Sequence, residues 1–279
     1  MRTFLRPFGP GCFASLMVLM AATPVLAQNT DAPPAITING TATVVSDYRF
    51  RGISQTDKNF AVQGSLTISH ESGFYASVWG SSVDAYVTAA SDLYAGGNGT
   101  TCCTARQEID IIGGFKKTVG SATFDVGVLY YFYPKTKAPG DFSSSDFFEP
   151  YVAVSGTMGP VTAKATVNYA PKQKALALDQ GATGLLAKND SVYIAGDFSA
   201  AVPGTPLGLT AHIGHSFGPS WLATTGRGNE YTDWGLGATL TYKAITLGVQ
   251  YVDTDTTFST PSGKDASKGG VVATLGVSF

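Results

Sequence analysis

From residue 36 to the C-terminus, apolar and polar residues alternate with a period of two in a series of short segments. In one of them, Val62, Leu66 and Ile68 share one face, and Gln63 and Thr67 share the other. A period of two indicates a β-strand with one apolar and one polar side. About twelve segments show this pattern, and they cover residues 36–50, 60–69, 73–83, 107–118, 122–133, 146–158, 161–171, 190–202, 207–217, 231–243, 245–254 and 270–279.

The connections between these segments alternate in length along the chain. The short ones are residues 71–72, 120–121, 159–160, 204–206 and 243–244, and the long ones are 52–59, 84–106, 134–145, 172–189, 218–230 and 256–269. This order is typical of an up-and-down barrel in an outer membrane, with short periplasmic turns and long outer loops. Most segments also have the roughly ten residues that a tilted membrane strand needs. We therefore predict an all-β, transmembrane antiparallel β-barrel of about 12 strands over residues 36–279.

The composition agrees with this fold but does not decide it. Charged residues make up 14% of the chain, aromatic residues 11%, and there are 33 glycines, whereas soluble domains carry about 25% charge. After the N-terminus, no apolar run reaches the roughly 18 residues that a membrane helix needs. A secreted, soluble β-sandwich has a similar composition, but it has no reason to keep the loops at one end short.

The N-terminus has the layout of a secretory signal peptide. Arg2 and Arg6 form a basic start, residues 13–22 an apolar core, and residues 25–27 a small-residue cleavage site. We expect residues 1–27 to be removed, residues 28–35 to form a short periplasmic segment, and the barrel to lie in the lipid bilayer of a bacterial outer membrane. Losing two arginines and no acid takes the net charge from −2 to −4. This charge gives no electrostatic reason to expect nucleic-acid binding.

The last strand ends in Phe279, and the apolar residues before it occupy every second position: Val277, Leu275, Ala273 and Val271. A terminal strand of this kind resembles the one that outer-membrane barrels present to their assembly machinery. We expect this machinery to be a partner of the chain.

Residues 44–55 read VVSDYRFRGISQ. This stretch resembles the signature of a proteobacterial family of outer-membrane porins that is labelled TorF-like. The matching positions are Ser46, Tyr48, Arg51, Gly52, Ser54 and Gln55, and weaker similarities occur at Glu108, Asp110, Glu149 and Asp233-Trp234. The resemblance implies an outer-membrane barrel with a porin role, and it brings no established substrate or catalytic residue.

If the apolar faces meet lipid, the opposite faces line the interior. The expected lining residues are Asp47, Arg49, Arg51, Gln63, Glu108, Asp110, Lys116, Asp125, Glu149, Lys164, Asp197, His212 and Gln250. Charge inside a membrane barrel needs water or a counter-charge, and for Arg51 we expect Asp47 or Glu108 as the partner. Acids outnumber bases in this set, which favours a weak preference for cations.

The expected strand number bounds the width of the pore. A dozen strands about 4.8 Å apart and tilted by about 40° enclose a backbone diameter of roughly 25 Å. Side chains on both walls reduce the passage to about 10 Å, which admits ions and small polar solutes. Residues 84–106 form the longest connection, and we expect this loop to fold inward if any does. Cys102 and Cys103, being adjacent, are interpreted as a feature of that exposed loop.

Aromatic residues gather near the ends of the expected strands: Tyr48, Phe50, Tyr130, Phe132, Tyr133, Phe147, Phe148, Trp234 and Tyr251. Outer-membrane barrels carry aromatic girdles at both interfaces of the bilayer. We predict that these residues anchor the barrel at that depth.

The function that these patterns favour is passive diffusion of ions or small polar solutes through a porin-like channel. One alternative is a structural or adhesive barrel whose long loops bind a partner, and another is an outer-membrane lipase-type enzyme. Catalysis needs a serine beside a histidine, yet His215 and Ser216 are adjacent in an expected strand and so point to opposite faces. His212 and Ser216 share a face but lie about 13 Å apart. No metal, nucleotide or other cofactor motif is visible, so we expect neither a cofactor nor a catalytic residue.

Overall fold

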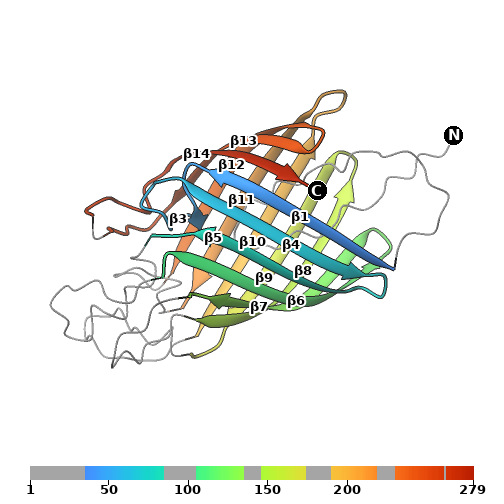
Figure 1. Cartoon of the computed structure of the whole chain (residues 1–279), viewed down its shortest axis with the longest axis horizontal. Helices are drawn as coiled ribbons and strands as arrows, with labels where there is room; N and C mark the ends of the chain where they lie inside the picture. The colour runs from blue at the N-terminus through green and yellow to red at the C-terminus, as the bar shows by residue number, and fades with distance from the viewer. Residues whose placement is uncertain (1–34, 85–104, 135–145, 174–189, 219–229, 261) are drawn as a thin grey trace.

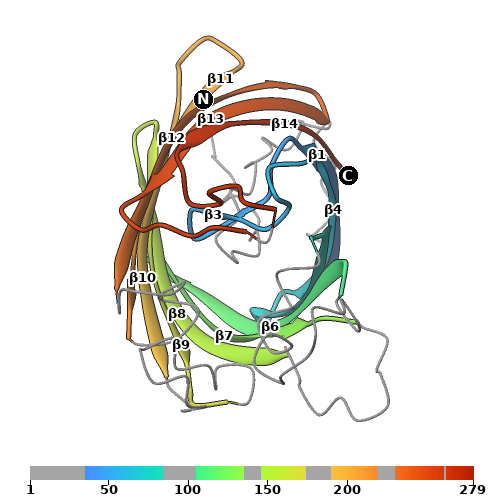
Figure 2. The same ribbon diagram turned by 90° about the vertical axis from the view of Figure 1, so that its left-hand side faces the viewer.

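The alternating segments form long strands that pair antiparallel in chain order and close into a barrel of 12 strands (Figures 1 and 2). The computed structural model describes residues 35–84, 105–134, 146–173, 190–218, 230–260 and 262–279. The wall strands are β1 (Ile36–Val45), β4 (Ala61–His70), β5 (Phe74–Ser82), β6 (Gln107–Val119), β7 (Ala122–Phe132), β8 (Phe147–Met158), β9 (Val161–Ala170), β10 (Ser191–Ala201), β11 (Leu207–Phe217), β12 (Tyr231–Tyr242), β13 (Ile245–Thr254) and β14 (Gly270–Ser278).

The first and last wall strands close the ring. β1 pairs with β4 over its whole length, from Ile36 to Val45. On its other side β1 pairs with β14 over Thr41–Val45 only. Backbone hydrogen bonds between Gly40 and Phe279 extend this second ladder by one pair. Closure pairs β1 with β14 from Gly40 to Val45, so the sheet has a ladder at its seam too, which is the condition for a sheet to stand in hydrocarbon.

The wall is apolar on its outer face and polar on its inner face, which is the reverse of a water-soluble protein. Large apolar side chains face outward, such as Val62 and Leu236, each 67% exposed. Polar side chains of the same strands face inward and are buried, such as Gln63 and Thr67, each 6% exposed. A soluble surface with so many neighbouring apolar groups is unfavourable, whereas lipid on the outside removes that cost.

Short and long connections lie at opposite ends of the barrel (Figure 1). Two of the short turns contain Gly120 and Gly159 with φ of 62° and 61°, a left-handed conformation that glycine adopts without steric cost. The long connections join the other strand ends, where β1 leads into residues 46–60 and β13 into residues 255–269.

The predicted fold class, strand order and twelve-strand count are therefore confirmed. The expected first strand, residues 36–50, is too long, because β1 ends at Val45. The chain then forms a separate two-stranded hairpin, β2 (Arg49–Phe50) and β3 (Ile53–Ser54), which is not part of the wall. Within the described residues, no helix has the length and apolarity to cross a membrane.

The prediction for the aromatic residues is only partly right. Tyr130, Phe132, Phe148, Trp234 and Tyr251 are exposed on the outer face, as a membrane girdle requires. In contrast, Tyr48, Phe50, Tyr133 and Phe147 are buried and belong to one apolar cluster inside the barrel mouth. These inner rings fill the space round the hairpin.

An apolar outer face makes a depth-dependent prediction for charged substitutions. Leu236 lies midway along β12, and Tyr242 lies at the end of that strand, 70% exposed. In lipid, Leu236→Arg should lower the free energy of unfolding by about 2–4 kcal/mol, and Tyr242→Arg by about 0–1 kcal/mol. Denaturant titration of the chain folded into lipid vesicles measures both values. Equal, small losses would mean that the outer face meets water.

Candidate functional site

The chain leaves the barrel wall at Ser46. The Ser46 amide donates to the carbonyl of Ala273 in β14, and the Ser46 hydroxyl accepts from the Ala273 amide, both at 2.9 Å. The serine side chain thus takes the place of the next main-chain acceptor in the ladder, so the backbone is free to turn inward. The β2–β3 hairpin that follows lies inside the ring of strands (Figure 2).

The hairpin turns tightly at its tip. Phe50 pairs with Ile53, so Arg51 and Gly52 are the two turn residues. Their φ values are 48° and 80°, the two positive values that a type I′ turn requires. A side chain at Gly52 would clash with Thr254 of β13 and Asp233 of β12. The tip therefore contacts the β12–β13 wall with a residue that has no side chain.

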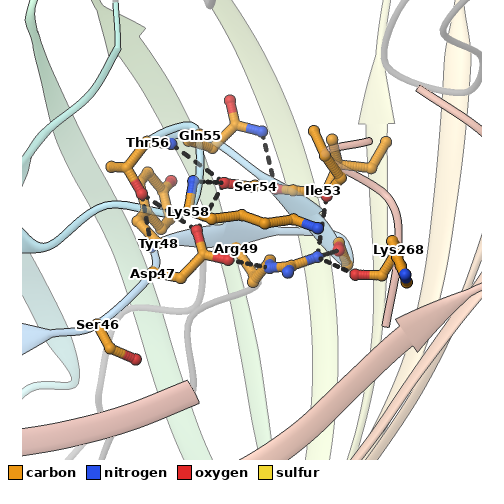
Figure 3. A network of polar contacts seen from close by, with 12 residues as sticks. Ser46, Asp47, Tyr48, Arg49, Ile53, Ser54, Gln55, Thr56, Lys58 and Lys268 are labelled. Atoms are coloured by element: carbon orange, nitrogen blue, oxygen red, sulfur yellow. Dashed lines mark hydrogen bonds and ion pairs between the residues drawn. The ribbon is translucent and has the colours of Figure 1, made fainter. Parts of the chain in front are cut away.

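Asp47 organises the base of the hairpin (Figure 3). Its carboxylate accepts from the Ser54 hydroxyl at 2.6 Å, from the Thr56 hydroxyl at 3.1 Å and from Nε of Arg49 at 2.6 Å. The amide of Gln55 donates to the carbonyl of Tyr48 at 2.7 Å. These contacts fold residues 47–56 into one unit, and they involve three positions of the sequence motif: Tyr48, Ser54 and Gln55.

Arg51 connects the hairpin tip to the opposite wall. Its Nη2 donates to both carboxylate oxygens of Glu149 in β8, at 2.9 and 2.8 Å. Arg51 is 2% exposed and Glu149 is fully buried. The guanidinium also lies over the ring of Tyr193, 4.2 Å from its centroid, and the Tyr131 hydroxyl donates to Glu149 at 3.0 Å. A buried ion pair with these extra partners fixes the tip in one place.

The wall on this side is acidic. Glu108 of β6 accepts from the hydroxyls of Tyr48 and Tyr133, both at 2.7 Å. Asp110 is fully buried, and neither of its carboxylate oxygens has a hydrogen-bond partner among the described residues. The β6–β7–β8 register places Asp110 beside Tyr131 and two strands from Glu149.

A second polar group lines the wall beyond the tip. His212 of β11 contacts Asp197 through Nδ1 at 2.7 Å and Asp233 through Nε2 at 2.9 Å. The hydroxyl of Tyr193 donates to Asp233 at 3.0 Å and lies 3.0 Å from Nε2 of His212. The ring of Tyr193 is therefore in contact with Arg51 on one side and with this carboxylate–histidine group through its hydroxyl.

The connection between β13 and β14 covers the hairpin from outside. Nη1 of Arg49 donates to the carbonyls of Ala266 and Lys268, at 2.9 and 3.2 Å. Asp57, in the loop after β3, accepts from Thr260, Ser262 and Lys264. Burial raises the pKa of the Asp57 carboxyl, but the hydrogen bonds from these three residues outweigh it and lower the pKa below its usual value. The contact therefore stabilises the cover at neutral pH and is lost when the pH falls through that lowered pKa.

A cavity of about 90 Å³ adjoins the hairpin. This volume accommodates a few water molecules or a small ion. Polar lining residues come from the hairpin and from several wall strands, and they include Asp47, Arg49, Arg51, Gln63, Thr166, Asn168, Asp197, His212, Asp233 and Gln250.

Among the expected lining residues, Gln63, His212 and Gln250 line the cavity, and the structure places the others in four groups. Asp47, Arg49 and Arg51 belong to the hairpin or its base and not to the wall, because β1 ends before them. Lys116 and Asp125 face each other on β6 and β7, with Nζ 3.4 Å from Oδ2. Glu108, Asp110 and Glu149 form the acidic wall, and Lys164 of β9 is the register partner of Asp197 in β10.

The expected partner of Arg51 is wrong. Asp47 pairs with Arg49, and Glu108 is occupied by two tyrosine hydroxyls, so Arg51 pairs with Glu149 instead. The reason is geometric, since the hairpin tip points across the lumen and away from its own base. The loop that we expected to fold inward lies mainly outside the described residues, as do Cys102, Cys103 and residues 1–27.

Several residues that hold the hairpin were missing from the expected set: Tyr131, Tyr133, Tyr193, Tyr231 and Asp233. A signal for two of them was present in the sequence. Tyr131 in β7 and Tyr133 directly after that strand stand at even spacings from Asp125, which was expected to point inward.

The three histidines contact hydroxyl groups or carboxylates. Ser216 is fully buried on the inner face, whereas the adjacent His215 is partly exposed and contacts the Thr232 hydroxyl at 2.9 Å. His212 contacts carboxylates and Tyr193, as described above. His70 contacts the Ser72 hydroxyl at 2.8 Å in an exposed turn.

Comparisons with known proteins give a family and a fold. A family model described as "Bacterial protein of unknown function (Gcw_chp)" matches residues 27–279. This description carries no TorF-like label, so that resemblance stays a prediction. No curated protein matches the chain in sequence.

Among solved structures, the NanC porin is similar to this chain with 12% identity and a TM-score of 0.53, over 87% of this chain and 99% of that chain. The KdgM porin has 8% identity and a TM-score of 0.45, over 87% and 97%. The outer membrane channel DcaP of Acinetobacter baumannii has 11% identity and a TM-score of 0.42, over 88% and 97%. The similarity to NanC agrees with the closed antiparallel barrel.

The buried ion pair predicts a local loss of stability when one partner is removed. Glu149→Gln leaves the Arg51 charge buried without its counter-charge, which costs about 3–5 kcal/mol. Hydrogen exchange at the Ser54 and Gln55 amides, which bond within the hairpin and its cover, should then accelerate on the order of 10²-fold or more. Glu71→Gln, in an exposed turn, is the control and should leave this exchange unchanged. Unaltered exchange in Glu149→Gln would contradict the role of the ion pair.

Proposed function

The chain belongs to the Gcw_chp family of bacterial proteins, and we propose that it is a narrow outer-membrane channel for ions and small polar solutes. The proposal includes export by residues 1–27 and recognition of the strand ending in Phe279 by the barrel assembly machinery. The hairpin from the first long connection forms the constriction of this channel.

One observation carries the proposal: the wall is apolar outside and polar and charged inside. Leu236 is exposed while Glu108, Asp110 and Glu149 are buried. Charge on the inner side of a membrane protein is expected where water or a counter-charge is present. Twelve strands also enclose more space than side chains alone fill, since eight strands already suffice for a filled interior.

The hairpin limits what passes. The expected passage of about 10 Å applies to a barrel with side chains alone, but β2 and β3 occupy part of this space and the adjoining cavity measures about 90 Å³. We therefore infer a low conductance and a low size limit, with larger solutes passing only when the hairpin is displaced.

The charges favour cations. Acidic residues of the interior outnumber basic ones, and those on the wall include Glu108, Asp110, Asp125, Glu149, Asp197 and Asp233. Acidic rings attract cations and repel anions. Pairing with Arg51, Lys116 and His212 offsets part of this charge, so we propose a weak preference.

Recording the current through a planar lipid bilayer tests whether the chain forms a channel. The purified, refolded chain should give small, ohmic steps in potassium chloride. A structural or adhesive barrel passes no current. If neither the unaltered chain nor a variant with residues 47–57 replaced by a short glycine–serine linker conducts, the channel proposal is wrong. Hydrolysis of an ester or phospholipid by the same preparation would support the lipase-type alternative instead.

The proposed selectivity has a matched pair of variants. Asp197 lines the cavity, whereas Asp253 lies at the outer end of β13 and accepts from Tyr251 at 2.6 Å. In a salt gradient, the unaltered channel should show a cation-selective reversal potential. Asp197→Asn should move the permeability ratio toward one, because a lumen charge is lost, and Asp253→Asn should leave it unchanged. An anion-selective reversal potential in the unaltered channel would overturn the preference.

A further inference from the structure

The side chain of Arg51 occupies a site with all the features of a guanidinium-binding pocket. Glu149 supplies a buried carboxylate, 2.8 Å from Nη2, and the Tyr131 hydroxyl holds that carboxylate from the other side. Aromatic rings lie against the guanidinium, with the centroids of Tyr193 and Phe50 at 4.2 and 4.8 Å. A carboxylate combined with aromatic faces is the chemistry that recognises a planar cation.

Most of this pocket belongs to the wall and not to the hairpin. Glu149, Tyr131 and Tyr193 stand on β8, β7 and β10, which are fixed by their ladders. Phe50 is the one hairpin residue among the aromatic partners. The pocket therefore keeps its carboxylate and two of its rings when the hairpin leaves.

Arg51 forms only part of the hydrogen bonds that its guanidinium and the nearby carboxylates could make. Both hydrogen bonds to Glu149 come from Nη2, and the buried Nε and Nη1 atoms have no hydrogen-bond partner among the described residues. Asp110 stands on the same wall, two strands from Glu149, and within the described part of the chain its two buried oxygens have no donor. A free guanidinium carries five donors in a rigid fork. Without the constraint of the hairpin backbone, such a cation has more ways to meet these acceptors.

The backbone of Arg51 adds a second constraint. Its φ of 48° is in the left-handed region, where residues with a large side chain are rare and strained. The conformation is held by contacts of the tip, including the Tyr231 hydroxyl, which donates to the Arg51 carbonyl at 3.1 Å. Arg51 thus reaches Glu149 at a cost in backbone strain, which a free solute does not have.

We propose that the wall pocket formed by Glu149, Tyr131 and Tyr193 is a binding site for guanidinium-bearing solutes, which Arg51 occupies in the closed channel. A solute of this class competes with Arg51 for Glu149, displaces the hairpin tip and binds at the constriction during passage. This inference rests on the proposed channel function and names the solute class for the same lumen.

The site is tested by removing the Arg51 side chain and adding free guanidinium in its place. Arg51→Ala empties the pocket, and its single-channel conductance in potassium chloride should exceed that of the unaltered chain several-fold. Guanidinium chloride added at about 10 mM, far below denaturing concentrations, should then reduce the current with an affinity on the order of millimolar. Methylammonium chloride at the same concentration should have a weaker effect, because an ammonium lacks the planar fork.

Further variants test whether guanidinium blocks the channel by binding at Glu149. In the double variant Arg51→Ala/Glu149→Gln, the guanidinium block should disappear, since the carboxylate partner is lost. Lys243→Ala is the control, because it removes a cation from an exposed turn away from the hairpin and leaves Arg51 in the pocket, so guanidinium at this concentration should block it much less. Arg51→Lys serves if Arg51→Ala does not fold, and it should show block by guanidinium at higher concentration. Protease resistance of the barrel verifies folding in each case.

The outcomes separate the two proposals. If Arg51→Ala or Arg51→Lys conducts but guanidinium blocks neither more strongly than methylammonium, the binding site is refuted and the channel stands. If guanidinium blocks the double variant equally well, it binds elsewhere and the assignment to Glu149 is wrong. If no variant conducts, the channel function itself fails.

Discussion

The ion pair between Arg51 and Glu149 is the contact on which the arrangement of the lumen depends. Both groups are withdrawn from water, and desolvation of a charged pair is repaid only by close geometry and additional partners. The Tyr131 hydroxyl and the Tyr193 ring are those partners. Because either charge alone is strongly unfavourable in this place, the hairpin has one position of low free energy, and the aromatic side chains round it pack against that position.

Closure of the barrel makes such a contact possible. A closed sheet satisfies its backbone in hydrocarbon and turns every second side chain inward, so the interior is as polar as the sequence makes it. A loop that enters this interior meets hydroxyls and carboxylates as well as the apolar cluster that contains Phe50, Tyr131 and Phe147. This explains why a hairpin rich in charge, with Asp47, Arg49 and Arg51, packs inside the protein, where its polar groups have partners and Phe50 joins the apolar cluster.

The sequence was sufficient for the wall but not for the hairpin. Period-two alternation and loop lengths gave the strands, because both follow from local geometry. Alternation continues through Asp47, Arg49 and Arg51 since the hairpin is itself β-structure, and this continuity hid the departure from the wall. A length mismatch was the available signal, as residues 36–50 exceed the expected partner strand, residues 60–69. The partner of Arg51 was beyond local reasoning, because Glu149 lies 98 positions away.

In the proposed channel, the wall residues that close the lumen are also those that bind a solute. A constriction made of apolar side chains would exclude water and ions equally, and it would offer a passing cation nothing in exchange for its hydration shell. The constriction here consists of a guanidinium held by a carboxylate and aromatic rings. Under the proposed function, such a closure is reversible by exchange, because a solute of matching chemistry would restore the contacts with Glu149 and Tyr193 that Arg51 gives up. If the proposal holds, the features that fix Arg51 in the lumen therefore also determine which solutes are able to replace it.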